Sequence, residues 1–160
     1  MLTKKILILT CIISTFITAT PSIDEESMAT IAAYIANLQR LGKKEHNADE
    51  TIDTILGTCS PIVTAHIHKH SSPADQNPEN FSYDGRDIFR DYFYALHEHA
   101  REWFLIIQKK AVTAYEPFTV TIEYRARPFA AKCHDGKLQI RCNAGQIIAI
   151  DETITTQWFR

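Results

Sequence analysis

Hydrophobic positions change their spacing along the chain, which separates an early helical part from a later strand part. Between Met28 and Leu38 the apolar residues recur every three or four positions, as on the buried face of a helix. Ser22 and Glu25 form a capping box before this stretch, and Gly42 is a natural left-handed stop after it. These signals predict a first helix from Ser22 to about Gly42.

A second, shorter helical pattern follows the first. Asn47 and Glu50 provide a cap, and a brief apolar stripe ends at Gly57, so a short helix is expected there. Residues 62–68 alternate between apolar and polar side chains, which predicts a strand. Residues 71–84 are rich in Ser, Pro, Asp and Asn, and this composition favours a loop.

The pattern changes again in the second half of the chain. Asp84-Gly85 opens a third predicted helix with a stripe of aromatic residues, which runs through about Arg101. From Trp103 onward the period is two, as in half-buried strands. The predicted strands cover residues 104–114, 118–129, 137–142 and 146–156.

Two turns are expected between the last strands. Asp135-Gly136 is a strong hairpin signal, and Asn143-Ala144-Gly145 is a second reversal. Helices early and antiparallel strands late indicate the α+β class. The predicted fold is a cone-shaped, curved antiparallel sheet with the N-terminal helices packed on its concave face. The mouth of such a cone would accept a small molecule.

The N-terminus has the composition of an export signal. Lys4 and Lys5 precede an apolar run, and small residues follow it. The run is shorter than the roughly 20 apolar residues that cross a bilayer. We therefore expect residues 1–22 to be a cleavable signal peptide and residues 23–160 a single domain. The mature protein would be secreted or periplasmic, without a membrane contact; an uncleaved anchor is the alternative.

Composition and charge are those of an ordinary globular domain. Of the 160 residues, 45% are hydrophobic and 22% charged, which suffices for one core. The formal net charge is −2, and basic residues are scattered among acidic ones. Because no basic face is visible, a nucleic-acid partner is not expected.

The order of elements resembles the nuclear transport factor 2-like superfamily, also called the SnoaL-like or ketosteroid isomerase-like fold. The similarity covers nearly all of residues 27–158. Four local stretches carry it: Ala33–Leu38, Tyr83–Ile88, Phe118–Tyr124 and Gly145–Asp151.

The resemblance implies a pocketed domain, commonly dimeric, on which both enzymes and non-catalytic binders are built. A small apolar or amphipathic molecule is the expected ligand, and no cofactor is implied. A homodimer would form through the sheet face opposite the helices. Tyr34 matches the tyrosine of the family's first helix, but the family's catalytic base is absent from the strand at 62–68. Steroid isomerisation by the usual mechanism is therefore not expected.

Three residues are candidates for acid–base chemistry. Asp151 lies on the last strand, where some members of the family place a functional acid. If Asp151 and His66 faced one cavity, they could exchange a proton with a substrate held near Tyr34. The alternative is a surface carboxylate paired with Arg141 or Arg125.

Five aromatic residues are candidates for the lining of a ligand pocket. The alternative for each is ordinary packing in the core. The set is Tyr34, Tyr92, Phe93, Trp103 and Tyr124.

His66, His68 and His70 alternate along one predicted strand, so that their rings share a face about 7 Å apart. Imidazoles so arranged could hold Zn²⁺ or Cu²⁺ with a further ligand. They could equally serve as pocket acids and bases, or be a polar strand face without chemistry.

Cys133 and Cys142 lie on either side of the predicted Asp135-Gly136 turn, and export would permit a disulfide between them. A two-residue turn would not pair them directly, so a bridge requires a longer loop.

Three functions remain open from the sequence. The leading expectation is a domain that binds a small molecule or a protein partner in or near the cone. A cofactor-free isomerase, dehydratase or cyclase with a His–Asp pair is the first alternative. A periplasmic metal-binding protein built on the histidine strand is the second.

Overall fold

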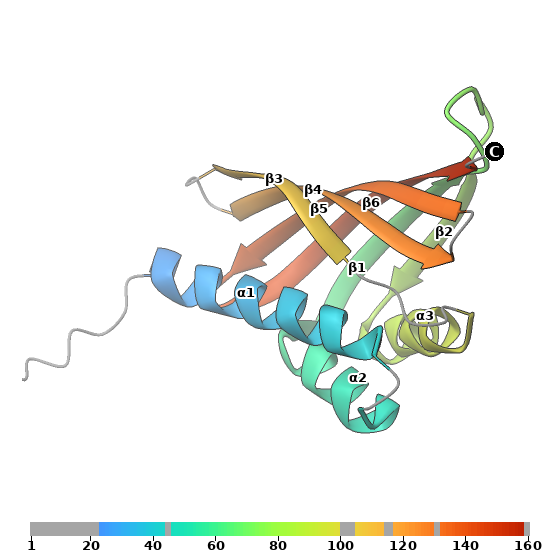
Figure 1. The fold of residues 1–160 in the computed structure, drawn as a ribbon. Coiled ribbons are helices and arrows are strands. Elements are labelled where there is room, and N and C mark those ends of the chain that lie inside the picture. Colours follow the sequence, from blue (N-terminus) through green and yellow to red (C-terminus); the bar gives the residue numbers. More distant parts are fainter. Residues whose placement is uncertain (1–22, 44–45, 100–104, 114–116, 130–131, 159–160) are drawn as a thin grey trace, which may run out of the picture.

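The computed structural model describes residues 23–43, 46–99, 105–113, 117–129 and 132–158. The expected signal peptide, residues 1–22, lies outside them. The elements, in chain order (Figure 1), are α1 Ile23–Leu41, α2 Ala48–Gly57, β1 Cys59–His70, β2 Glu79–Asp84, α3 Arg86–His99, β3 Leu105–Thr113, β4 Phe118–Phe129, β5 Lys132–Asn143 and β6 Gln146–Trp158. None of the helices within these ranges is long and apolar enough to cross a membrane.

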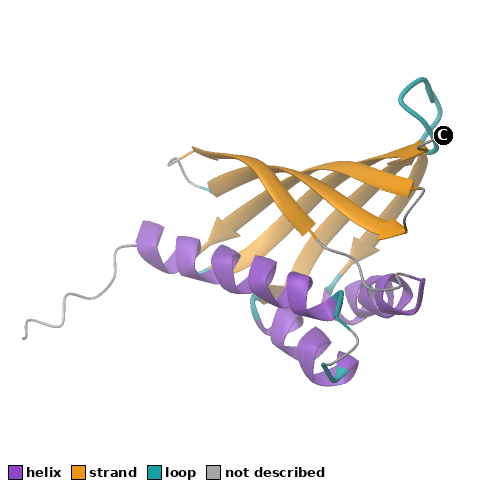
Figure 2. Ribbon diagram, viewed as in Figure 1, coloured by secondary structure: helices purple, strands orange, loops and turns teal. Residues whose placement is uncertain are grey.

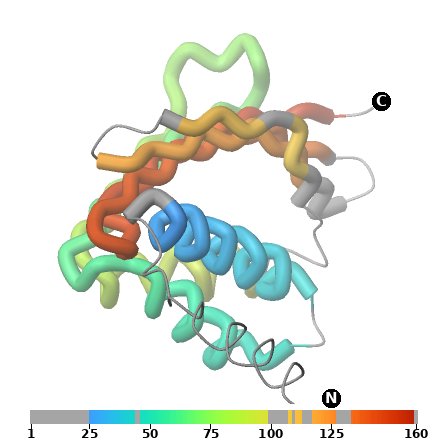
Figure 3. Tube along the Cα trace, turned by 90° about the vertical axis from the view of Figure 1, so that its left-hand side faces the viewer, coloured from blue at the N-terminus to red at the C-terminus, as the bar shows by residue number. Residues whose placement is uncertain are grey.

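Six strands form one curved sheet in the order β2-β1-β6-β5-β4-β3. All three helices lie on one side of it (Figure 2), and the sheet arches over α1 (Figure 3). This arrangement confirms the α+β class and the helix-covered concave face. The expectation of a purely antiparallel sheet is wrong at one place, because β1 and β6 run parallel.

The helices form where the sequence signals placed them. Asn47 caps α2 by accepting hydrogen bonds from the backbone N–H groups of Asp49 and Glu50. In α1 the side chains at three- and four-residue spacing are buried against the sheet and α2. These are Ile31, Tyr34, Ile35, Leu38 and Leu41.

Alternation along β4 divides its side chains as predicted. One face of the strand is buried between sheet and helices, and its members are Phe118, Val120, Ile122, Tyr124 and Ala126. Side chains between them, such as Glu123, point to the opposite face, which is more exposed. We call the helix-covered side the concave face and the other side the outer face.

The loop expected at residues 71–84 is wrong for its second half, which forms β2. Phe81 and Tyr83 lie half-buried on the concave face, whereas Asn80 and Ser82 point outward. This alternation is a strand signal that the polar composition of the segment hides. The added strand pairs with β1 and extends the sheet at that edge.

Asp135-Gly136 is not a turn but the middle of β5, so this prediction is also wrong. Tyr124 is the cross-strand partner of Gly136. A Cβ atom on Gly136 would lie 2.1 Å from Cζ of Tyr124, because the tyrosine ring lies across the glycine. The glycine therefore serves close packing of a ring, not chain reversal.

The second predicted turn is confirmed. Ala144 and Gly145 join β5 to β6 with φ angles of 47° and 70°, as a two-residue hairpin requires. The Thr30 hydroxyl donates a 2.8 Å hydrogen bond to the Gly145 carbonyl oxygen, which attaches α1 to the turn.

Candidate functional site

A carboxyl group lies inside the concave face. Glu152 projects from β6 between Ile67 of β1 and Leu138 of β5, its two cross-strand partners. Both neighbours are fully buried, and Glu152 itself is only 6% exposed. An ionised carboxylate is costly in such surroundings unless it is hydrogen-bonded or paired with a cation.

Two tyrosines from different elements bind this carboxyl. The Tyr92 hydroxyl, on α3, donates to Oε2 of Glu152 over 2.8 Å. The Tyr124 hydroxyl, on β4, donates to Oε1 over 2.5 Å. We call Glu152, Tyr92 and Tyr124 the carboxyl–tyrosine cluster. It links three segments that are far apart in the sequence, so it specifies their mutual position.

Burial is the largest influence on the pKa values of the three residues in the cluster. It raises the pKa of Glu152 above the usual value, although the two tyrosine hydrogen bonds and the charge of Lys69 act in the opposite direction. Burial and the neighbouring Glu152 charge also hold the pKa values of Tyr92 and Tyr124 well above normal. The tyrosines therefore stay neutral hydrogen-bond donors, and Glu152 titrates closer to neutrality than an exposed glutamate.

Further aromatic rings surround the cluster. Tyr92 stacks on Phe89 with ring centroids 5.7 Å apart and meets Phe93 edge-on at 5.4 Å. The ring of Tyr34, on α1, meets that of Phe93 edge-on, with centroids 6.4 Å apart. Burial, then the charges of Cys59 and Glu152, raise the pKa of Tyr34. Tyr34 is thus within the electrostatic reach of the carboxyl.

The cluster borders a less buried part of the concave face. Tyr92 and Tyr124 are 8% and 5% exposed, so the cluster is not completely closed to solvent. Ile107, the cross-strand partner of Tyr124 on β3, is 43% exposed. Ile154, two residues beyond Glu152 on β6, is half-buried. We call this side of the concave face, lined by Ile107, Tyr124 and Ile154, the mouth.

The structure does not bring the predicted catalytic residues together. Tyr34 is buried under the concave face, whereas His66 and Asp151 lie on the outer face, next to each other on β1 and β6. Asp151 accepts a 3.0 Å hydrogen bond from Arg141, which is the surface-pair alternative. The predicted pocket His–Asp pair is therefore wrong.

The histidine strand does not form the predicted metal site. His66 and His68 contact Ser82 and Asn80 of the neighbouring β2, and His70 contacts the Asp75 carbonyl oxygen. Each Nδ1 atom thus has its own partner instead of converging on a common point. Within the part of the chain that the structure describes, no three His, Cys, Asp or Glu side chains are placed to hold a metal ion.

Four of the five predicted pocket aromatics lie on or under the concave face. Tyr34, Tyr92, Phe93 and Tyr124 all belong to the hydrophobic core. Tyr92 and Tyr124 in addition bind Glu152, a role that the sequence interpretation did not assign to them. Trp103 lies outside the described residues.

The predicted Cys133–Cys142 disulfide is wrong. Both residues are buried free thiols at opposite ends of β5. Nine residue-to-residue steps along one extended strand separate their Cα atoms by about 30 Å, against the roughly 7 Å that a disulfide allows.

Sequence reasoning missed Glu152 and chose its neighbour Asp151. The choice of Asp151 rested on the family resemblance, and an irregularity in β6 obscures which of the two side chains faces inward. Cys142 pairs with Ile147 and Arg141 with Ala149, so Ile148 is an extra residue, and a bulge reverses the alternation there. Counting forward from Ile150, whose side chain is buried, places Glu152 on the concave face.

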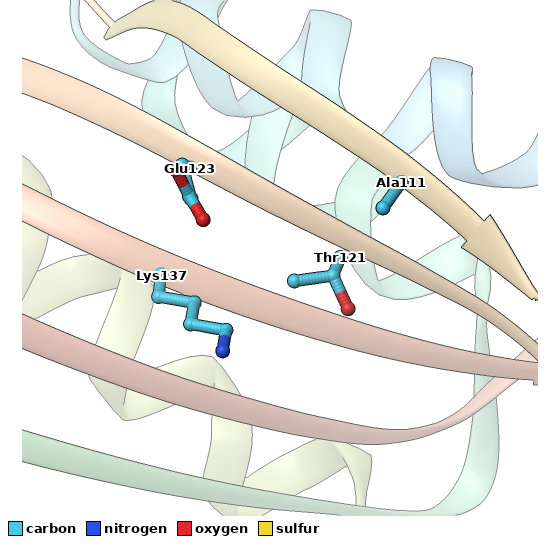
Figure 4. A pocket seen from close by; sticks show the side chains of 4 residues that line it. All are labelled: Ala111, Thr121, Glu123 and Lys137. Atoms are coloured by element: carbon cyan, nitrogen blue, oxygen red, sulfur yellow. The ribbon is translucent and has the colours of Figure 1, made fainter.

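The outer face carries a separate depression of about 200 Å³. Its lining comes from β3, β4 and β5 and is mostly polar: Ala111, Thr121, Glu123 and Lys137 (Figure 4). These side chains alternate with the buried ones of the same strands, so the depression is not the predicted cone. It lacks a buried group that would hold a ligand in one orientation.

No protein-family model and no curated protein matches the sequence. Solved structures do match it. A candidate ketosteroid isomerase from Kribbella flavida DSM 17836 is 12% identical and superimposes with a TM-score of 0.56, over 85% of this chain and 82% of that chain. A nuclear transport factor 2-like protein from Burkholderia xenovorans LB400 is also 12% identical, with a TM-score of 0.53 over 81% and 88%.

This chain has the nuclear transport factor 2-like fold. The resemblance in its sequence is thereby confirmed at the level of architecture. A de novo designed protein with a curved β-sheet is equally similar, at a TM-score of 0.55 and 14% identity over 81% of this chain and 85% of that chain. The nuclear transport factor 2-like fold therefore does not determine a function, which has to be inferred from the site.

Proposed function

We propose that the protein binds a small molecule at the mouth of the concave face, with the carboxyl–tyrosine cluster as its polar anchor. The observation that carries this proposal is the buried Glu152 carboxyl, held by hydroxyls from α3 and β4. A buried ionisable group with a shifted pKa, beside apolar side chains that stay partly exposed, is a candidate functional site.

Stability alone gives a weaker account of the cluster. Well-packed apolar residues in place of a buried charged group are often neutral or stabilising. The sheet around Glu152 already consists of such residues, among them Ile67 and Leu138. A protein partner is also less suited than a small molecule, because the cluster exposes less than a tenth of each side chain.

A fragment screen with matched variants tests the proposal. Ligand-observed NMR would compare wild type with Glu152→Gln, which keeps the shape but not the charge, and with Asp151→Asn on the outer face. We expect fragments whose binding weakens in Glu152→Gln and is unchanged in Asp151→Asn. The proposal fails if no fragment distinguishes the two variants.

A second candidate is a cofactor-free isomerase, dehydratase or cyclase that uses Glu152 in place of the His–Asp pair. The raised pKa of Glu152 favours it, because a carboxyl that titrates nearer neutrality can take or give a proton. Incubation with enolisable ketones in D₂O would reveal it as deuterium incorporation that Glu152→Gln abolishes. Equal incorporation by wild type and variant would exclude it.

Export and dimerisation belong to the proposal as separate parts. The basic start and apolar run of residues 1–22 support a cleaved signal, and the partly exposed outer face supports a dimer contact. N-terminal sequencing of protein from the medium or periplasm should begin near Ile23. Sedimentation at tens of micromolar should give twice the mass of the mature chain; a monomer would contradict the dimer.

A further inference from the structure

We propose that the ligand of the concave site is an organic cation, an alkylamine or alkylammonium, whose charged head pairs with Glu152 while its tail lies in the mouth. This inference rests on the small-molecule site proposed above and adds the chemical class of its ligand. Three features of the cluster support it.

The first feature is the direction of the hydrogen bonds. Both tyrosine hydroxyls donate to Glu152, one to each carboxylate oxygen. A carboxylate has about four acceptor positions on its two oxygens, so about two remain free for further donors. An ammonium head offers N–H donors and a positive charge, whereas a negatively charged carboxylate or phosphate of a ligand would repel Glu152.

The second feature is the lack of a contacting cation. Asp53, Asp135 and Asp151 are among the described acids that have an ion-pair partner. Lys69 influences Glu152 electrostatically, but its Nζ lies 4.7 Å from the centre of the Phe81 ring, and its side chain is exposed. Among described residues Glu152 therefore has hydrogen-bond donors but no ion-pair partner, and a ligand cation would supply one.

The third feature is the aromatic surroundings. Tyr92 has three rings within 6 Å of its own centroid, those of Tyr83, Phe89 and Phe93. Ring faces attract organic cations. Phe89 and Phe93 are fully buried and only support the cluster. The rings that could meet a cation are therefore those of Tyr92, Tyr124 and the half-buried Tyr83. A divalent metal ion would need several carboxylate, carbonyl or imidazole ligands, and the single carboxylate here does not provide them.

The depth of the cluster fits a molecule with one charged end. Ile107 on β3, 43% exposed, and Ile154 on β6, half-buried, present apolar surface at the mouth. A short alkyl chain would cover that surface while its head reaches the carboxyl. A cation without an apolar tail would leave the mouth uncovered and would bind more weakly, because less apolar surface is buried.

Calorimetry with three six-carbon probes tests the ligand class: hexylammonium, 1-hexanol and hexanoate at neutral pH. Wild type should bind hexylammonium at least about tenfold more tightly than hexanol, as a charge-assisted hydrogen bond predicts, and hexanoate least of all. In Glu152→Gln the preference for the ammonium should fall to about twofold or less. Asp151→Asn, one residue away on the outer face, should keep it.

Proton linkage provides a measurement on the wild type alone. Burial raises the pKa of Glu152, and a bound cation lowers it again. Binding should therefore release protons at pH values where the free carboxyl is still protonated, which a pH series from 4.5 upward would cover. Calorimetry in two buffers of different ionisation enthalpy would detect this release as a difference in apparent binding enthalpy. The readout does not depend on whether a variant folds.

The outcomes separate the ligand class from the proposed function. One outcome is that hexanol binds as tightly as hexylammonium and that Ile107→Asp at the mouth weakens hexanol binding. The proposal of a cationic ligand is then overturned, whereas the proposal of a small-molecule site stands. If no probe binds wild type and no protons are released, the site itself is overturned. An ammonium preference that Glu152→Gln leaves intact would also overturn the pairing.

Discussion

The two faces of the sheet carry similar acids in very different surroundings. Glu152 on the concave face is bound by two tyrosines and almost fully buried, whereas Asp151, its neighbour in β6, pairs with Arg141 at the outer surface. They are consecutive residues, and the pleat of the strand directs their side chains to opposite sides. The comparison teaches that a functional assignment on a strand depends on knowing which way the alternation runs.

The largest contrast between the faces is expected for large apolar side chains. Phe93 is fully buried beside Tyr34 and Tyr92, whereas Ile62 is 81% exposed. Phe93→Ala should lower the free energy of unfolding by about 3–5 kcal/mol, because it leaves a cavity. Ile62→Ala should change it by less than about 0.5 kcal/mol. Denaturant unfolding checks both, and a similar loss in the two variants would contradict the assignment of the faces.

A glycine pair tests the close approach of Tyr124 to β5. Gly136→Ala should cost about 1–3 kcal/mol, because the new methyl group displaces the ring that binds Glu152. Gly57→Ala at the end of α2 has no atom within 4 Å of the added carbon and should be neutral or stabilising by up to about 1 kcal/mol. Thermal unfolding compares them; a harmless Gly136→Ala would show that Tyr124 is held elsewhere.

The pH dependence of stability should distinguish the two acids. Because burial raises the pKa of Glu152, the folded protein keeps this proton to a higher pH than the unfolded chain. The contribution is complete below the usual value of 4.5 and is lost as pH rises through the folded value. Glu152→Gln should therefore flatten the decline of stability above pH 4.5.

Asp151→Asn serves as the control for that experiment, since it removes the acid on the other face. Its unfolding profile should keep the decline seen in wild type. If both variants follow the wild-type curve, Glu152 does not carry the proton that the fold retains.

The smallest effects are expected from the outer-face histidines. His66→Ala and His68→Ala remove hydrogen bonds to Ser82 and Asn80 that lie in exposed surroundings, so each should cost about 1 kcal/mol or less. Zn²⁺ titration should give the same weak binding for wild type and the double variant. Tight binding that the double variant loses would restore a metal role for this strand.

The sequence predicted those elements whose signals are local. The cap at Asn47, the alternation of β4 and the turn at Ala144-Gly145 each depend on a few neighbouring residues, and all three are present. The turn predicted at Asp135-Gly136 is wrong because the glycine makes room for the Tyr124 ring of the adjacent strand, a contact that neighbouring residues in the sequence do not reveal. The parallel pairing of β1 with β6 is equally non-local.

The candidate site was predicted in its aromatics but not in its acid. Tyr92 and Tyr124 could be assigned to the concave face because each belongs to an unbroken apolar pattern. Glu152 could not, because the extra residue Ile148 reverses the alternation of β6 between Ile147 and Ile150. Asp151 was chosen from the family resemblance. Whether a strand contains a bulge depends on its pairing with neighbours, so the local pattern could not correct that choice.

The assignment of the binding site to the concave face is tested most directly by mapping hexylammonium on the protein with NMR chemical shifts. We predict that saturable shifts centre on Glu152, Tyr92 and Tyr124, and that the imidazole signals of His66 and His68 stay unchanged. Shifts that centre on the outer-face histidines, or their absence throughout the titration, would contradict this account.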